Sequence, residues 1–227
     1  MFTHKINNPN NLKIENNNST VIPFGMRCTS ALVCKWAQLR KISLPFDWTI
    51  PTLPHKIKNV LENNFDEFIP NIPRTFFNKY DIGLAHFNKN IPEGIEQYKR
   101  RIERFNNIIN SSDKKYFIYI NEDFLYDKKF RVENFNQKMF QDMLELEIFI
   151  KEKYTNIDYT IIYFNFTEEK IPSNSNIFNI VINNSQYFES ESVAPVSQFR
   201  IFCAKILAEL FNTEFKCEFN SDDFNNL

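Results

Sequence analysis

Cys28 is the residue whose position along the chain is best suited to covalent chemistry. It follows a short apolar strand pattern that ends at Gly25, and it directly precedes an apolar helix pattern over residues 29–39. A helix N-terminus stabilises a thiolate, and the N–H groups of the first turn can form an oxyanion hole. Gly25 would let the backbone approach a substrate closely. We therefore predict a nucleophilic thiol at Cys28, with a small buried residue as the alternative.

A nucleophilic cysteine needs a base, and the chain contains three histidines. His4 lies in a polar N-terminal segment, and His55 opens an amphipathic helix pattern. His86 lies near the end of an apolar strand pattern over residues 81–87. We predict that His86 is the base, and the alternative is a hydrogen-bonded structural histidine.

Four other charged residues could take part in a site. Asp47 lies between two aromatic residues and needs a partner if it is buried, so it either orients the imidazole or caps a turn. Arg100, Arg101 and Arg104 lie on the polar face of an amphipathic helix pattern and could clamp a carboxylate or a phosphate. Glu96 precedes Arg100 by one helical turn, which favours a solvated, ion-paired helix face instead.

The sequence contains no motif for a metal or a cofactor. Its four cysteines include no C-x-x-C pair, and it has neither a glycine-rich nucleotide loop nor an H-E-x-x-H motif. We expect free thiols, no metal and no cofactor. Cys34 and Cys203 lie in apolar helix patterns typical of a core, and Cys217 lies in a polar tail.

The expected elements alternate between strands and helices. This alternation predicts an α/β fold, a three-layer sandwich with a mostly parallel sheet of about five strands and helices on both faces. The strand patterns cover residues 20–25, 81–87, 115–120, 158–166 and 177–182. The helix patterns cover residues 29–39, 53–63, 94–109, 134–153 and 196–210.

Length and composition indicate one domain and exclude some classes of partner. We expect a flexible Asn-rich arm over residues 1–19, a single domain over residues 20–215 and a polar tail over residues 216–227. The net charge of −1 argues against a nucleic-acid partner, and no apolar stretch is long enough to span a membrane. Without a signal-peptide pattern, we expect a cytoplasmic protein that acts on a peptide or a small molecule.

Two stretches resemble the opening of a domain family of unknown function whose members are described as papain-like cysteine peptidases. They are residues 23–28 (Pro-Phe-Gly-Met-Arg-Cys) and residues 39–48, which end in Pro-Phe-Asp-Trp. Residues 82–87 resemble the histidine segment of that family, and residues 98–105 resemble its arginine-rich helix. The resemblance covers residues from about 20 to 125. It implies that Cys28 is the nucleophile and His86 the base, with Asp47 a candidate third member.

Two functions follow from these residues. The first is a thiol-dependent hydrolase or acyltransferase in which His86 deprotonates Cys28 for attack on an amide or acyl carbonyl. The second is a noncatalytic module or transferase that binds an anionic small molecule, such as a nucleotide sugar, at the helix N-terminus near Cys28. The candidate substrate-binding residues are Gly25, Arg27, Trp48, Arg100 and Arg104.

Overall fold

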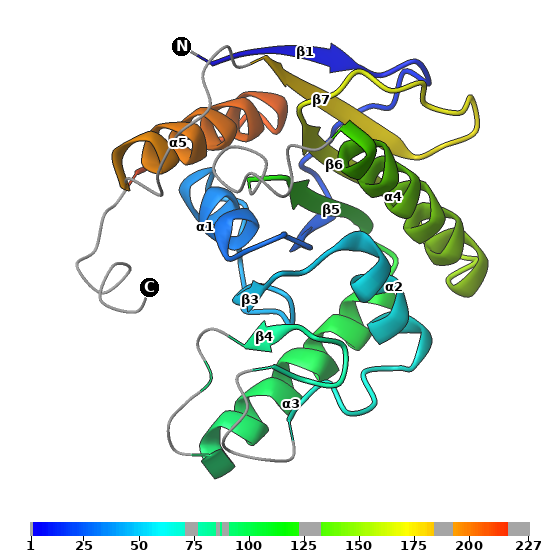
Figure 1. Ribbon diagram of the computed structural model, residues 1–227, viewed down its shortest axis with the longest axis vertical. Helices are drawn as coiled ribbons and strands as arrows, with labels where there is room; N and C mark the ends of the chain where they lie inside the picture. Colours follow the sequence, from blue (N-terminus) through cyan, green and yellow to red (C-terminus); the bar gives the residue numbers. More distant parts are fainter. Residues whose placement is uncertain are drawn as a thin grey trace.

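The computed structural model describes residues 2–70, 77–84, 87, 91–122, 133–183 and 193–217, and it has an α/β fold. Its main sheet has five strands, which lie in the order β1-β7-β6-β5-β2 (Figure 1). The parallel strands are β2 (Ser19–Pro23), β5 (Lys114–Ile120), β6 (Tyr159–Asn165) and β7 (Ile177–Asn183). β1 (Thr3–Asn7) pairs antiparallel with β7. The predicted α/β fold with a mostly parallel five-stranded sheet is confirmed.

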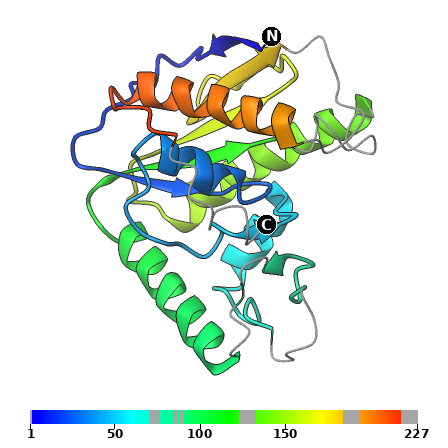
Figure 2. The same cartoon turned by 90° about the vertical axis from the view of Figure 1, so that its left-hand side faces the viewer.

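Helices cover both faces of the sheet and give the predicted three layers (Figures 1 and 2). α1 (Thr29–Trp36) and α5 (Val193–Leu210) share one core with alternate strand residues such as Ile118 and Ile162. The opposite core contains the intervening strand residues. It also contains the apolar sides of α2 (Pro54–Glu62), α3 (Ile91–Ile109) and α4 (Glu133–Lys153). The period of two in a strand places successive residues in different cores, as a sheet buried on both faces requires.

The buried stripe of α3 contains an arginine that the sequence analysis placed on the solvent side. Tyr98, Arg101, Phe105 and Ile109 are buried, whereas Arg100 is exposed. The expectation of a solvated face is therefore wrong for Arg101. Residues three or four positions apart share one helix face, so the spacing from Tyr98 to Phe105 places Arg101 inside the apolar stripe.

The N-terminal segment departs from the expected loose arm. Residues 3–7 form β1, whose register pairs Thr3 with Asn183 and Asn7 with Asn179. The expectation is corrected for these residues, because backbone pairing with β7 orders a strand whose side chains are mostly exposed. Of the expected polar tail, residues 218–227 lie outside the described residues.

The expected strand over residues 81–87 is much shorter in the structure. β4 comprises only Gly83–Leu84 and pairs with β3 (Thr49–Ile50) in a separate two-stranded sheet. Ala85 and His86 lie outside the described residues. Figure 2 shows this small sheet apart from the main sheet.

In the described part of the chain, no helix combines the length and apolar character needed to cross a bilayer. The same residues contain no cluster of three or more histidine, cysteine or acidic side chains that could hold a metal ion.

Candidate functional site

Cys28 lies where β2 passes into α1, beyond the carboxyl end of a parallel strand. β2 ends at Pro23, and Cys28 is the N-cap of α1 without a capping side-chain hydrogen bond. The first helical bond runs from the N–H of Leu32 to the carbonyl of Cys28, at 3.0 Å. The N–H groups of the first turn of α1, which precede Leu32, therefore have no acceptor within the helix. The first turn also contains no acidic residue. This is the position that the sequence analysis assigned to Cys28.

Gly25 is required by the packing of its own loop. A Cβ atom at this position would lie 2.3 Å from the carbonyl oxygen of Arg27 and 2.9 Å from Oγ of Ser30. The chain folds tightly here because residue 25 has no side chain, and this turn brings Cys28 to the start of α1. Ser30 is fully buried, and its Oγ has no hydrogen-bond partner among the described residues.

A buried ion pair lies beside Cys28. Glu122 follows β5, is fully buried, and accepts hydrogen bonds from Nε and Nη2 of Arg200 on α5 at 2.6 and 2.9 Å. Oγ1 of Thr29 donates to the same carboxylate at 2.6 Å. Two charge-assisted bonds in a fork arrangement, with a hydroxyl as a third donor, hold the Glu122 carboxylate in one orientation.

The charges of this pair act on the Cys28 thiol in opposite directions. Burial raises the pKa of Cys28 above its usual value of 9.0, and the negative charge of Glu122 also raises it. Arg200 and Arg27 lower the pKa. Burial is the largest effect, so the resting thiol is protonated at neutral pH. A reaction at Cys28 therefore needs a base that removes the proton.

Glu122 and Arg200 were not among the site residues expected from the sequence. Two signals could have found them. Asn121-Glu122 directly follows the strand pattern at residues 115–120, where polar residues border the crevice of a parallel sheet. Arg200 is a lone cation in the first half of an apolar helix pattern. Only the tertiary fold shows that the two residues pair, because they are 78 positions apart.

Asp47 is bound by Arg40. Nε and Nη2 of Arg40 both donate to Oδ2 of Asp47, at 2.9 and 2.7 Å, and the N–H of Leu44 donates to the same oxygen at 3.1 Å. Burial raises the pKa of the fully buried Asp47 carboxyl, and these donors oppose the increase. The guanidinium of Arg40 also lies over the ring of Trp48, 5.6 Å from its centroid. The arrangement fits the turn-capping interpretation of Asp47 and places Trp48 against its own chain.

The three histidines have different surroundings. His86 lies outside the described residues, so its distance from Cys28 stays a prediction. His4 lies in β1, at the opposite edge of the main sheet from β2. Nδ1 of His55 lies 2.7 Å from Oδ2 of Asp142, which joins the start of α2 to α4. His4 also lies against the ring of Phe202 on α5, with the ring centroids 5.7 Å apart.

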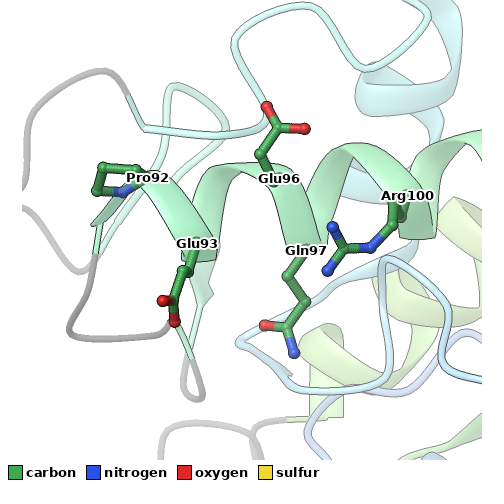
Figure 3. Close-up of a pocket in the computed structure, with 5 residues that line it drawn as sticks. All are labelled: Pro92, Glu93, Glu96, Gln97 and Arg100. Carbon is green, nitrogen blue, oxygen red and sulfur yellow. The ribbon is translucent and has the colours of Figure 1, made fainter.

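Arg100 and Arg104 lie on α3. Arg100 lines a pocket of about 410 Å³ together with Pro92, Glu93, Glu96 and Gln97 (Figure 3). Nε of Arg104 donates to the carbonyl of Arg100, and Arg104 does not line this pocket. Cys28 is not among the lining residues either. The structure thus brings Cys28, Gly25 and Arg27 together, and it places Arg100 at a separate pocket that Arg104 does not line.

Two of the other cysteines match their expected core surroundings, whereas Cys217, expected as an exposed thiol, packs against the same core. Cys34 and Cys203 are buried free thiols in the core between α1 and α5, and burial raises the pKa of both. Cys217 is a half-buried free thiol. Cys28 is also half-buried, so Cys217 provides a matched thiol outside the site.

Comparisons with protein-family models, with curated proteins and with solved structures each found no match to this chain.

Proposed function

We propose that this protein is a thiol-dependent hydrolase that acts on amide or acyl substrates, with Cys28 as its nucleophile. One observation carries the proposal: the half-buried Cys28 thiol lies at the start of α1, beside the buried Glu122–Arg200 pair. The resemblance of residues 23–28 and 39–48 to papain-like cysteine peptidases supports the same assignment. The expected setting is the cytoplasm, with a peptide or a small acyl compound as substrate.

In the proposed reaction, His86 takes the thiol proton as the sulfur of Cys28 attacks the substrate carbonyl. The unpaired N–H groups of the first turn of α1 stabilise the oxyanion that forms. The C–S bond of a thioester forms, the bond to the leaving group breaks, and the protonated base gives its proton to that group. Water then cleaves the thioester and regenerates the thiol. Thr29, Glu122 and Arg200 act as positioning residues that hold the start of α1.

A chromogenic ester, p-nitrophenyl acetate, tests this proposal because it needs no knowledge of the natural substrate. Incubation of the full chain is expected to give a burst of p-nitrophenolate and an acetyl group on Cys28, detected by peptide mass spectrometry. Cys28→Ser removes the burst, and His86→Ala slows it by about a hundredfold, the lower range for loss of a general base.

Cys217→Ser is the matched control, because it removes a half-buried thiol outside the site and is expected to leave the burst unchanged. The proposal fails if Cys28→Ser retains the burst or if Cys217 is acetylated as fast as Cys28. It also fails if p-nitrophenyl acetate acetylates Cys28 in the His86→Ala variant at the parent rate.

A further inference from the structure

The loop that joins β2 to α1 concentrates buried backbone donors. α1 has no capping side-chain hydrogen bond, and Thr29, Ser30 and Ala31 in its first turn are at most 1% exposed. A buried helix start without partners is unusual, because water or a capping group normally accepts these bonds. Within the described part of the chain, no bond is donated by the N–H groups of Gly25, Met26, Thr29, Ser30 and Ala31, all of them buried residues. Buried N–H groups are nearly always paired, so this concentration of donors needs a physical explanation.

Ser30 places a hydroxyl donor in the same loop. The residue is 0% exposed, and among the described residues its Oγ has no hydrogen-bond partner. This oxygen lies 2.9 Å from the point that a Cβ atom on Gly25 would occupy. The hydroxyl therefore points back across the loop towards Gly25. Burying a hydroxyl without a partner is unfavourable, so an acceptor bound in this loop would gain a hydrogen bond from Ser30.

The electrostatic surroundings of the loop favour an anion. The loop feeds the positive end of the α1 dipole, and the first turn of α1 contains no acidic residue. Glu122 is the acid beside the loop, but Arg200 binds both of its oxygens, at 2.6 and 2.9 Å. The paired carboxylate therefore opposes an anion only weakly. Arg27 and Cys28 are half-buried, so the loop reaches solvent at these two residues.

The number of donors indicates which anion fits. The oxyanion of the proposed thiol reaction is a single oxygen, which takes about two N–H groups. The loop offers unpaired N–H groups on both sides of Cys28 and the Ser30 hydroxyl as well. A phosphate group presents several strong acceptor oxygens. Successive N–H groups at a turn from a strand into a helix are a common way to bind phosphate.

We propose that the β2–α1 loop binds the phosphate group of an acyl phosphate, a substrate whose carbonyl carbon is bonded to a phosphate oxygen. The loop N–H groups and the Ser30 hydroxyl hold the phosphate oxygens. The carbonyl then lies beside the thiol, because Cys28 belongs to the same loop. This inference rests on the proposed function for the thioester step, and it names the substrate class of that step.

The thioester step balances with phosphate as the leaving group. The sulfur of Cys28 attacks the carbonyl carbon and forms the C–S bond, while the base takes the thiol proton. The bond between the carbonyl carbon and the phosphate oxygen breaks, and its electron pair leaves with the phosphate. The base then gives the proton to the departing inorganic phosphate. Water cleaves the thioester and releases the carboxylic acid.

Phosphate binding can be measured without any turnover. Inorganic phosphate and phenyl phosphate are the probes, one a free ion and the other a phosphate on a larger molecule. The rate of Cys28 alkylation by iodoacetamide in the full chain is followed at constant pH, with sodium chloride used to keep the ionic strength constant. Both probes should slow it in a saturable manner by about tenfold, because a bound anion beside the thiol disfavours the thiolate. Alkylation of Cys217, a half-buried thiol outside the loop, should not change.

Two variants locate the binding. Ser30→Ala should weaken the affinity for both probes by about tenfold, the effect of one hydrogen bond to a charged group. Thr160→Val is the matched control. Thr160 is also 0% exposed with an unpartnered Oγ1, but it lies at the amino end of β6, whereas Cys28 lies beyond the carboxyl end of β2. Its affinity should equal that of the parent. Circular dichroism checks folding, and Ser30→Gly replaces Ser30→Ala if the latter does not fold.

Acetyl phosphate and p-nitrophenyl acetate test the substrate class. Both transfer an acetyl group to Cys28, but only the first carries a phosphate. Ser30→Ala should slow acetylation by acetyl phosphate by about tenfold and leave the p-nitrophenyl acetate burst unchanged, because the hydroxyl contacts only the phosphate. Inorganic phosphate should inhibit acetylation by acetyl phosphate competitively in the parent.

The inference is overturned if neither probe slows alkylation of Cys28 beyond the sodium chloride series. It is also overturned if Ser30→Ala retains the parent affinity, or if Thr160→Val loses as much affinity as Ser30→Ala. Acetylation of Cys28 by p-nitrophenyl acetate but not by acetyl phosphate would overturn the substrate class and leave the proposed function intact. Acetylation by neither donor would overturn the proposed function itself, even where phosphate protects Cys28 from alkylation.

Discussion

The hydroxyl of Thr29 donates a 2.6 Å hydrogen bond to Oε2 of Glu122 and so ties the first turn of α1 to the end of β5. Arg200 of α5 binds both oxygens of the same carboxylate. Three elements from distant parts of the chain therefore meet on one buried carboxylate. The residue before Thr29 is Cys28, so this junction determines where the thiol lies at the carboxyl end of the sheet.

We predict that Glu122→Gln lowers the free energy of unfolding by about 3 kcal/mol, because it removes the buried carboxylate charge that pairs with Arg200. Thr29→Val is expected to cost about 1.5 kcal/mol, the value of one hydrogen bond to a charged group. Urea denaturation at pH 7, followed by circular dichroism, measures both changes.

Glu145→Gln provides the control for this prediction. It breaks a partly exposed pair with Lys58, at 3.7 Å, and should change the stability by less than about 0.5 kcal/mol. A loss for Glu122→Gln that is no larger than the loss for Glu145→Gln would contradict a structural role for the buried pair.

Removing the charge of Glu122 and removing the charge of Arg200 should shift the pKa of the Cys28 thiol in opposite directions. Glu122 raises the pKa of Cys28 and Arg200 lowers it. Neutralising the acid in Glu122→Gln should therefore lower the pKa and increase the rate of alkylation by iodoacetamide at pH 7–8. Arg200→Met should raise the pKa and decrease that rate, because less thiolate is present at a given pH.

Peptide mass spectrometry distinguishes alkylation at Cys28 from alkylation at Cys217. The rate at Cys217 should not change in either variant, since burial alone is the cause of its raised pKa. Rate changes of the same sign at Cys28 in both variants would indicate a general loosening of the fold rather than an electrostatic effect.

Elements with strong apolar periodicity could be predicted from the sequence because local pattern determines them. β5, β6 and β7 are nearly continuous apolar runs, and α3 and α4 were expected within a few residues of their observed bounds. β1 has no such signal. Its sequence, Thr-His-Lys-Ile-Asn, is mostly polar and exposed, and it becomes a strand only because the edge of β7 offers backbone partners.

The position of Cys28 followed from local pattern, but its electrostatic partners did not. Glu122 and Arg200 are joined only by the packing of α5 against the sheet. Asp47 binds Arg40, seven residues earlier, and sequence alone could not separate that contact from an interaction with His86. Arg101 was expected on the solvent side of the helix because it is charged. Its spacing from Tyr98 and Phe105 nevertheless puts it in the buried stripe of α3.

Substitutions at Gly25 and Ser30 test whether a backbone atom or a side chain excludes a Cβ atom at position 25. Gly25→Ala should lower the stability by about 2–3 kcal/mol, because its Cβ would meet the Arg27 carbonyl, a backbone atom that cannot turn aside. Ser30→Ala alone should cost less than about 1 kcal/mol, since Oγ of Ser30 has no partner.

The double variant Gly25→Ala/Ser30→Ala should recover only a small part of the loss, as the Arg27 carbonyl stays in place. Thermal unfolding of the four proteins measures the cycle. Full recovery in the double variant would show that the Ser30 side chain, and not the backbone, is the obstacle.

We expect the free energy of unfolding to fall in alkaline solution, because the Tyr98 hydroxyl ionises less readily in the folded chain than in the unfolded chain. Burial raises the pKa of Tyr98 from its usual 10.0 to about 12. The neutral phenol is present in both the folded and the unfolded chain below pH 10, so no stability is lost there. Between pH 10 and 12 the unfolded chain ionises first, and the free energy of unfolding should fall towards a total loss of about 2–3 kcal/mol.

Tyr98→Phe removes this loss. The variant should unfold with nearly the parent free energy at pH 7, because the buried hydroxyl has no hydrogen-bond partner. From pH 9.5 to 11, its stability should decline less steeply than that of the parent. Urea denaturation at half-unit pH steps gives both slopes. Equal slopes would show that Tyr98 ionises as easily in the folded chain as in the unfolded chain, and that other buried groups, such as Cys203, account for the alkaline loss.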